Sequence, residues 1–167
     1  MILWLLTAVV FGHGGPPERR ALLWDSAADM TIASSHGLLF EDSDWNWVCE
    51  ELFGSSLPTG VIQTPNALLV GSTAGLAHSS NGCDWDWTPE LIGEMIWDLA
   101  VDTNDSSKVW VATEAGLWWS DDHGSTFTFA YTPDTMASVR SFVQLADNTF
   151  MVLGFVDGQA TAWSQTE

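Results

Sequence analysis

The stretch Ser120-Asp121-Asp122-His123-Gly124-Ser125-Thr126-Phe127 reads S-x-D-x-G-x-T-F. An aspartate carboxylate at the third position accepts backbone N–H bonds across a tight turn, and the glycine adopts a conformation that a side chain would forbid. Threonine and phenylalanine favour a strand directly after the turn. The stretch therefore predicts a structural turn that leads into a strand, with the ring of Phe127 pointing into a core.

Two weaker copies of this pattern lie upstream. The second copy, in residues 79–87, has Asn81 in place of the aspartate and Cys83 directly after Gly82, and the first copy, in residues 41–47, has lost the glycine. Each copy follows an apolar segment with a Gly-Leu pair, and these pairs begin at residues 37, 75 and 116, at spacings of 38 and 41 residues. A fourth copy starts at Phe150 and ends near Ser164, where the Asp turn should begin.

A repeat of about 40 residues with several short strands is typical of propeller blades. We predict an all-β fold, namely a partial β-propeller of four-stranded antiparallel blades, with about three and a half blades present. Within the third blade, strands are expected at residues 95–101, 108–113, 117–120 and 126–130. The predicted blades cover approximately residues 21–57, 60–90, 94–132 and 138–167.

These repeats resemble the Asp-box, or BNR repeat, of β-propellers. Sialidases, xyloglucan-type glycosidases, sortilin-like receptors and photosystem II assembly factors carry this repeat, and residues 45–51 and 81–85 look closest to exported bacterial BNR-repeat proteins. The resemblance implies that the Asp turn is structural and lies away from the usual binding face. The turn residues that it assigns are Ser120, Asp122, Gly124, Thr126 and Phe127, with Asn81, Gly82 and Trp85 in the second copy.

The N-terminal run at residues 1–11 is apolar and is followed by glycines and prolines. It resembles the apolar region of a signal peptide and is too short to span a bilayer. We predict a signal peptide and linker at residues 1–15 and a single partial propeller domain at residues 16–167. The mature chain would have no membrane span and would be secreted, periplasmic or extracellular. The alternative is that residues 1–11 form a β-strand.

The fourth blade lacks a sequence for its outer strand, and three explanations remain open. The chain is a fragment of a longer propeller, or copies of it associate through exposed apolar blade faces into a ring. In the third explanation, residues 1–11 supply the missing strand and close a small propeller of four blades.

The chain is strongly acidic, with 22 acidic and four basic residues among 167, and a formal net charge of −18. Such a surface repels phosphate backbones and excludes nucleic acid as a partner. His36, His78 and His123 do not share a repeat position, so we expect no metal site. The segment 102–105 lacks the glycine and glutamate of a calcium loop, which favours a hairpin turn. We expect no cofactor, and a protein or a glycan as the ligand.

Cys49 and Cys83 lie in neighbouring blades, near the outer strand of the first and the turn of the second. In an exported protein they are candidates for one disulfide, and the alternative is two buried thiols. They are too few for a structural zinc site by themselves.

Aromatic pairs recur at matched repeat positions. Residues two apart in a strand face the same side, so each pair forms one apolar patch. Such a row can be a carbohydrate platform, but its recurrence favours a core between blades. The adjacent residues Trp118 and Trp119 should face opposite sides. The pairs are Trp45 with Trp47, Trp85 with Trp87, and Phe127 with Phe129.

Candidate ligand-binding residues are Glu114, Asp157 and His36, and no catalytic residue is assigned. Glu114 and Asp157 fall at matched positions in turns between second and third strands, and in propellers such turns line the binding face. A sialidase site, with three arginines and a Tyr–Glu pair, is excluded, because only Arg140 and Tyr131 remain beyond the N-terminal region.

Two functions remain open for such a chain. The sequence favours a non-catalytic exported binding or scaffold module. The alternative is a glycosidase-like hydrolase fragment that acts on polysaccharide, which needs two carboxylates facing across a pocket. The placement of Glu114, Asp157, Glu94 and Asp134 would discriminate between the two functions.

Overall fold

The computed structural model describes residues 19–24, 30–42, 44–49, 56–132, 138–145 and 149–166. Within these residues the chain forms fifteen β-strands and one turn of 3-10 helix, η2 (Pro89–Leu91). The predicted signal peptide and linker, and the rival strand at residues 1–11, lie outside the described residues. Among the described residues, no helix has the length and apolar character that a membrane crossing requires.

The strands form four antiparallel sheets, here called blades A to D, each built from consecutive segments of the chain. Blade A contains β1 (Arg19–Trp24), β2 (Met30–Ser34), β3 (Gly37–Asp42) and β4 (Asp44–Cys49). Blade B contains β5 (Pro58–Gln63), β6 (Leu68–Ser72), β7 (Gly75–Ser79) and β8 (Asp86–Trp87). Blade C contains β9 (Ile96–Val101), β10 (Val109–Thr113), β11 (Leu117–Ser120) and β12 (Thr128–Tyr131). Blade D contains β13 (Ser138–Gln144), β14 (Thr149–Val156) and β15 (Gln159–Thr166).

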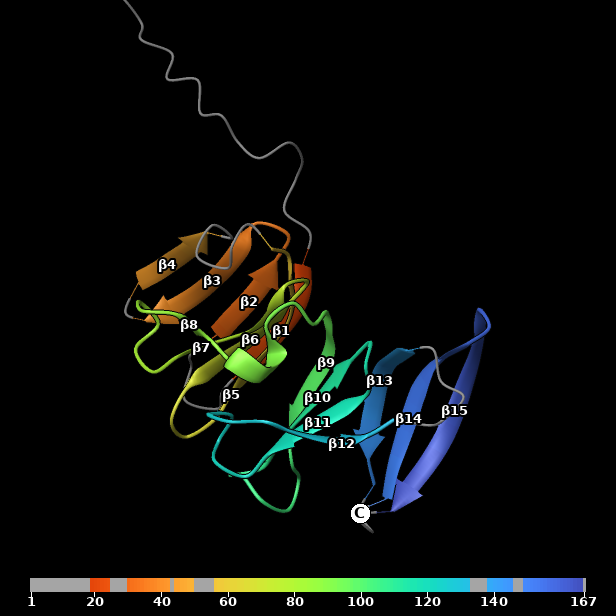
Figure 1. The fold of residues 1–167 in the computed structure, drawn as a ribbon. Helices are drawn as coiled ribbons and strands as arrows, with labels where there is room; N and C mark the ends of the chain where they lie inside the picture. The colour runs from red at the N-terminus through yellow and green to blue at the C-terminus, as the bar shows by residue number, and fades with distance from the viewer. Residues whose placement is uncertain are drawn as a thin grey trace, which may run out of the picture.

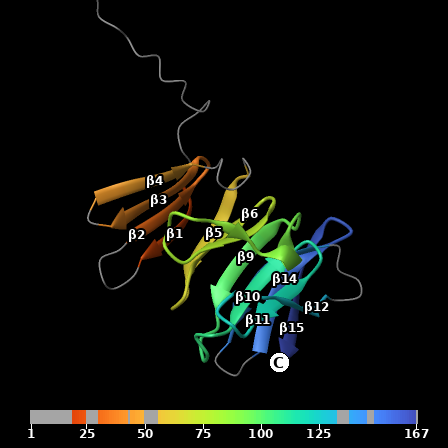
Figure 2. The ribbon, with the colours of Figure 1, turned by 60° about the vertical axis from the view of Figure 1, so that its left-hand side comes forward.

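The blades follow one another in space as they do in sequence, with blade A at one end and blade D at the other (Figure 1; Figure 2). Each blade is an up-and-down meander, because its strands are hydrogen-bonded in sequence order. The predicted all-β fold, a partial propeller of antiparallel blades, is confirmed. The strands of blade C begin and end within two residues of the predicted bounds.

Apolar clusters fill the spaces between neighbouring blades. The strand β10 shows the principle, since Val109 and Val111 pack toward blade B while Trp110 and Ala112 pack toward blade D. Alternation along a strand places successive side chains on opposite faces, so a strand between two blades is apolar throughout. The clusters join the blades into one core. The buried residues between blades A and B are Ala33, Leu38, Val48, Val61, Leu68, Val70 and Ala77. Those between blades B and C include Leu69, Leu76, Ile96, Leu99 and Phe127.

The aromatic pairs are only partly in the core, so the prediction that they form a core between blades is wrong at three positions. Phe127 is buried at 6% exposure, and Trp85 and Trp87 are partly buried against the cluster between blades A and B. Trp45 and Trp47, however, are 50% and 46% exposed. They occupy the face of blade A that points away from blade B, where no described blade covers them.

Phe129 is also an exception, with 43% of its surface exposed. Its ring lies over Gly116 and meets the edge of Trp118 at 5.2 Å between ring centroids. Trp118 and Trp119 face opposite sides as predicted, since Trp118 packs toward blade B and Trp119 toward blade D.

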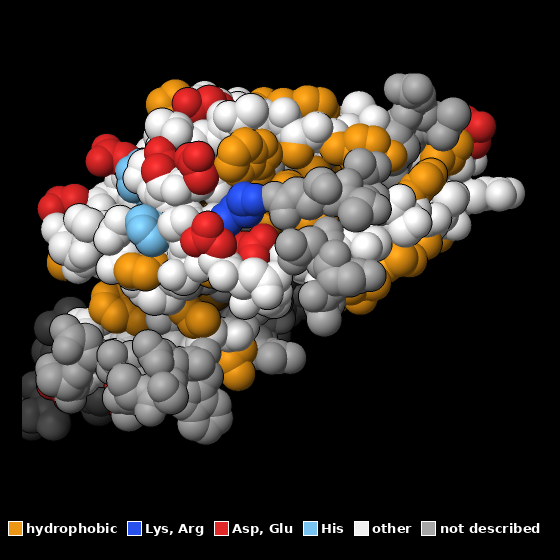
Figure 3. Space-filling model, turned by 90° about the horizontal axis from the view of Figure 1, so that it is seen from below, with side chains coloured by type: hydrophobic (Ala, Val, Ile, Leu, Met, Phe, Trp, Pro, Cys, Tyr) orange, Lys and Arg blue, Asp and Glu red, His pale blue; other side chains and the backbone are white. Residues whose placement is uncertain are grey.

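Both end blades expose apolar side chains on their outer faces. Blade A exposes Leu22 together with Trp45 and Trp47, and blade D exposes Val143 and Leu153. In Figure 3, hydrophobic side chains are visible at the blade D end and elsewhere on the face, and acidic side chains lie beside a small basic group near its centre. The inner faces between blades are covered, but Leu57, Ile92 and Phe129, in or beside blades B and C, are also exposed.

Candidate binding face

The first strand of each blade carries a one-residue bulge near its start. The register of β5 with β6 skips Thr59, that of β9 with β10 skips Trp97, and that of β13 with β14 skips Arg140. In blade A the register skips residue 20 at the same place. A bulge leaves its extra residue unpaired and redirects the side chain, and bulges are common beside functional sites.

These bulge residues reach the first strand of a neighbouring blade. The Thr59 hydroxyl donates to the carbonyl oxygen of Ile96 at 2.7 Å. The Arg140 guanidinium lies over the ring of Trp97, 3.6 Å from its centroid. In addition, the Asp98 carboxylate accepts bonds from the Ser141 hydroxyl at 2.6 Å and the Phe142 N–H at 3.2 Å. The bulges thus form one connected end of blades B, C and D.

The turns between second and third strands lie at the same end of each blade. In blade C the Thr113 hydroxyl accepts a bond from the N–H of Ala115 and donates to the carbonyl oxygen of Gly116. Ser34 and Ser72 make the equivalent pairs of bonds in blades A and B. The shared Ser/Thr-x-x-Gly pattern closes these three turns after the same number of residues.

Blade D departs from this pattern, and its longer hairpin overturns the prediction that Asp157 matches Glu114. Gly154 occupies the Ser/Thr position and has no side chain to cap a turn, so the hairpin continues for two more residues on each strand. It closes at Asp157 and Gly158, whose φ values of 50° and 78° suit a two-residue type I′ turn. Asp157 therefore does not match Glu114, because it lies at the tip of a longer hairpin.

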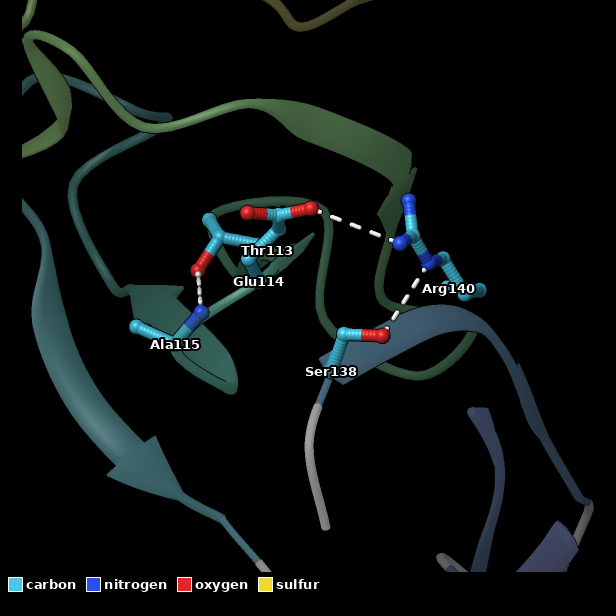
Figure 4. Close-up of polar contacts among 5 residues, drawn as sticks. All are labelled: Thr113, Glu114, Ala115, Ser138 and Arg140. Atoms are coloured by element: carbon cyan, nitrogen blue, oxygen red, sulfur yellow. Dashed lines mark hydrogen bonds and ion pairs between the residues drawn. The ribbon is translucent and has the colours of Figure 1, made fainter. Parts of the chain in front are cut away.

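Glu114 and Arg140 form the polar centre of this end of the molecule (Figure 4). Arg140 Nη2 donates to Glu114 Oε1 at 3.3 Å, and Arg140 Nε donates to the Ser138 hydroxyl at 3.1 Å. The side chains of Arg140 and Glu114 are 30% and 57% exposed. The ring of Phe155 lies 5.8 Å from the guanidinium. We call these residues, with Trp97, the binding face.

The binding face combines a cation, an aromatic ring and a carboxylate. A guanidinium stacked on an indole stays charged and keeps its edge available for hydrogen bonds. Within the described residues, Arg140 Nη1 makes no hydrogen bond, and the buried Trp97 Nε1 has no partner. Such a surface can hold a polar ligand by stacking and hydrogen bonding.

The other predicted binding residues are not brought to this centre. His36 lies in the turn between β2 and β3 of blade A, with its Nδ1 2.9 Å from the Ser35 hydroxyl. Among the described residues, no hydrogen bond or ion pair joins Glu114 to Asp157 or Glu94. Asp134 lies outside the described residues.

The Asp turn of blade C, residues 120–127, lies at the opposite end of β11. Asp122 Oδ1 accepts bonds from the N–H groups of Ser125 and Thr126, both at 2.9 Å, and from the Ser120 hydroxyl at 2.6 Å. Thr126 Oγ1 donates to Asp122 Oδ2 at 2.7 Å, and the N–H of Gly124 bonds to Ser120 Oγ. Burial alone would raise the pKa of the Asp122 carboxyl, but these hydrogen bonds outweigh it and lower the pKa to about 2.

The corresponding turn of blade B, residues 79–85, uses an amide instead. Asn81 Oδ1 accepts bonds from the N–H groups of Cys83 and Asp84, both at 2.9 Å. Ser79 Oγ accepts a bond from the N–H of Gly82 at 2.8 Å. The turn is one residue shorter than that of blade C. In both turns the polar side chain is occupied by local backbone groups.

The hairpin at residues 102–105 is held by its own side chains. Asp102 Oδ1 accepts bonds from the N–H groups of Asn104 and Asp105. Asp102 Oδ2 accepts bonds from Trp110 Nε1 at 3.1 Å and Gln144 Nε2 at 2.8 Å. Burial would raise the pKa of Asp102, but these bonds hold it below the usual value. The carboxylate joins the hairpin of blade C to blade D.

The structure does not support the predicted disulfide, because Cys83 is a free and exposed thiol. The side chain of Cys49 lies outside the described residues. Within the described part of the chain, no group of three or more His, Cys, Asp or Glu residues could hold a metal ion.

Solved structures with a similar fold include natural and designed proteins. The computationally designed Ika4 protein superposes with a TM-score of 0.62 at 14% identity, over 92% of this chain and 94% of that one. The extracellular domain of a B. thetaiotaomicron protein described as a hybrid two component system has a TM-score of 0.67 at 18% identity. An ancestral GH74 enzyme has a TM-score of 0.63 at 19% identity.

The chain has the β-propeller fold. The match to the extracellular domain covers 87% of this chain but only 23% of that protein. The match to the ancestral GH74 enzyme covers 81% of this chain and 21% of that enzyme. No protein-family model and no curated protein matches the sequence. At these identities the similarity establishes the fold alone.

The sequence did not reveal Trp97 as part of the site. It lies in an alternating strand like many core residues, and only the register of β9 with β10 shows that it is a bulge. The one available signal was the position of Arg140 near the start of a repeat, directly comparable with Trp97 in the repeat before.

Proposed function

We propose that the chain is an exported, non-catalytic binding or scaffold module of the BNR/Asp-box propeller type. Its ligand, a protein or a glycan, would lie on the binding face of blades C and D. The observation that carries this proposal is the stack of Arg140 on Trp97, 3.6 Å from the ring centroid, with the exposed carboxylate of Glu114 beside it.

The chemistry of this face supports binding. Sugars and peptides both present apolar C–H groups for an aromatic ring and hydroxyl or carbonyl groups for a guanidinium. Arg140 is held by Glu114 and Ser138 before a ligand arrives, so little side-chain entropy is lost on binding. Export is supported by the apolar run at residues 1–11 and by the extracellular domain among the similar structures.

A glycan array with the purified chain, followed by titration calorimetry, tests the proposal. We expect saturable binding that falls at least tenfold in Trp97→Ala and Arg140→Ala, because each removes half of the stack. Lys108→Ala is the matched control, since Lys108 also lies over tryptophan rings, 5.5 and 5.2 Å from their centroids, but at the other end of β10. Equal losses of binding affinity in Trp97→Ala, Arg140→Ala and Lys108→Ala would contradict the proposal.

The alternative function, a glycosidase-like hydrolase fragment, is tested in the same samples. GH74 enzymes are among the similar structures, and one of them is a xyloglucanase from Xanthomonas campestris with a TM-score of 0.63 at 14% identity. Release of reducing ends from xyloglucan that disappears in Glu114→Gln would establish the alternative. Binding without release in the wild-type chain would support the non-catalytic module.

A further inference from the structure

A hollow opens between blades A and B, at the end of the blades opposite the binding face. Its cavity volume is about 280 Å³. This is just below the usual range for small-molecule sites, roughly 300–1,000 Å³, and suits a single ring better than a longer ligand. The residues that line it are Thr31, Phe40, Glu41, Gln63, Leu68 and residues 79–82.

The hollow exists because a small residue replaces a large one at a repeated position. Thr31 pairs with Phe40 in blade A as Leu69 pairs with His78 in blade B. Between blades B and C, Leu69 is fully buried, and its Cδ1 would lie 2.5 Å from a Cβ built on Gly124. At the equivalent place between blades A and B, the shorter Thr31 leaves the space unfilled.

Several polar groups around the hollow are free to bind a ligand. Among the described residues, the Thr31 hydroxyl and the Ser80 hydroxyl make no hydrogen bond. The Gln63 amide uses its nitrogen on the Thr64 carbonyl, which leaves its oxygen as an acceptor. Ser79 and Asn81, in contrast, are occupied by the turn.

The hollow also has an aromatic wall. Phe40 is partly buried against the cluster between blades A and B, and its ring edge lies 3.6 Å from a Cβ built on Gly82. An aromatic ring packs well on the apolar C–H face of a sugar, while an amide oxygen accepts a hydrogen bond from a neighbouring hydroxyl. The strongly acidic chain, with a formal net charge of −18, also disfavours anionic ligands.

We propose that this hollow binds a single uncharged pyranose ring. Phe40 packs on one face of the sugar, the Gln63 amide oxygen accepts a hydrogen bond from a hydroxyl, and Thr31 and Ser80 complete the hydrogen bonds. This site goes beyond the proposed function, because it lies at the other end of the blades and shares no residue with the binding face. No bond is made or broken in the sugar.

Two-dimensional NMR of the full-length chain, titrated with glucose and N-acetylglucosamine, tests this inference. We expect saturable shifts of the Thr31, Glu41, Ser80 and Gly82 amides. Glucuronate, which adds a charge, and sorbitol, which lacks the ring, should bind at least tenfold more weakly. Arg140→Ala, which disrupts the binding face, should leave these shifts unchanged.

Thr31→Leu is the decisive variant, because it fills the hollow with the residue that blade B has at position 69. We expect it to stay folded and to lose the shifts. Gln63→Ala gives a second variant, which removes the acceptor without filling the hollow and should weaken binding at least tenfold for both neutral sugars. Absence of saturable shifts in the wild-type chain, or shifts that persist in Thr31→Leu, would overturn the proposal.

Discussion

The interface between blades A and B and the interface between blades B and C use the same positions with different residues. Leu69 closes the second interface against Gly124, whereas Thr31 leaves the first one hollow. The strand pairing around both residues is the same. The comparison shows that strand register is kept from repeat to repeat, while the size of one side chain decides whether an interface is filled or open.

The tryptophans of the fourth strands give the largest expected contrast. Trp85 is partly buried between blades A and B, so Trp85→Ala should reduce the free energy of unfolding by about 3 kcal/mol. Trp45, at the equivalent place in blade A, is 50% exposed, and Trp45→Ala should cost less than about 1 kcal/mol. Urea unfolding followed by circular dichroism measures both values.

If Trp85→Ala and Trp45→Ala reduced the free energy of unfolding by the same amount, the outer face of blade A would be covered in solution. Self-association through the exposed blade faces would then be the explanation to test. Sedimentation equilibrium of the wild-type chain would then show an apparent mass that rises with concentration. In Trp45→Ala the apparent mass would fall toward that of a single chain.

The glycines of the two turns provide a smaller contrast. In Gly124→Ala the new methyl would meet Leu69 at 2.5 Å and the residue would keep a φ of 90°, so we expect a loss of about 2–3 kcal/mol. In Gly82→Ala the nearest atom is 3.6 Å away, and only the φ of 73° is unfavourable, which should cost about 1 kcal/mol. Thermal unfolding of both variants tests the difference. A larger loss in Gly82→Ala would show that the interface between blades A and B is as tightly filled as the other.

The smallest expected difference in stability is between a carboxylate and an amide in the Asp turn, as in Asp122 of blade C and Asn81 of blade B. This difference depends on pH. Asp122→Ala should lower stability by about 1–2 kcal/mol at neutral pH, and Asp122→Asn by less, because Asn81 makes the same kind of bonds in blade B. The pKa of Asp122 lies below its ordinary value of 3.8, so its contribution is present above that pH. It disappears as the pH falls through about 2.

Urea unfolding of the wild type and Asp122→Asn at neutral pH and near pH 3 checks this dependence. The difference in free energy of unfolding between the wild type and Asp122→Asn should be smaller near pH 3 than at neutral pH. A constant gap would show that the charge of Asp122 contributes nothing to the turn.

Much of the fold could be predicted from the sequence because its signals are local. The Gly-Leu spacing and the Asp turn marked the period, and the strands of blade C followed from alternation and turn residues. The longer hairpin of blade D could not be predicted in the same way. It depends on Gly154 standing where the other blades have serine or threonine, a position that only the register reveals.

The site residues were harder to predict because they depend on contacts between blades. Glu114 was found through its turn, but its partner Arg140, and Trp97 on which Arg140 stacks, come from bulges that carry no sequence signature. The exposure of Trp45 and Trp47 was missed for a related reason. Matched positions in a repeat have matched surroundings only where a neighbouring blade covers them.

The most direct test of this account is the pair of exchanges at the repeated position, Leu69→Thr and Thr31→Leu, measured by urea unfolding of the full-length chain. Leu69→Thr should lower the free energy of unfolding by about 2–4 kcal/mol, because it opens a cavity and buries a hydroxyl. Thr31→Leu should leave stability unchanged or raise it, because the added methyl group enters an existing hollow. Similar destabilisation by both exchanges would contradict the account.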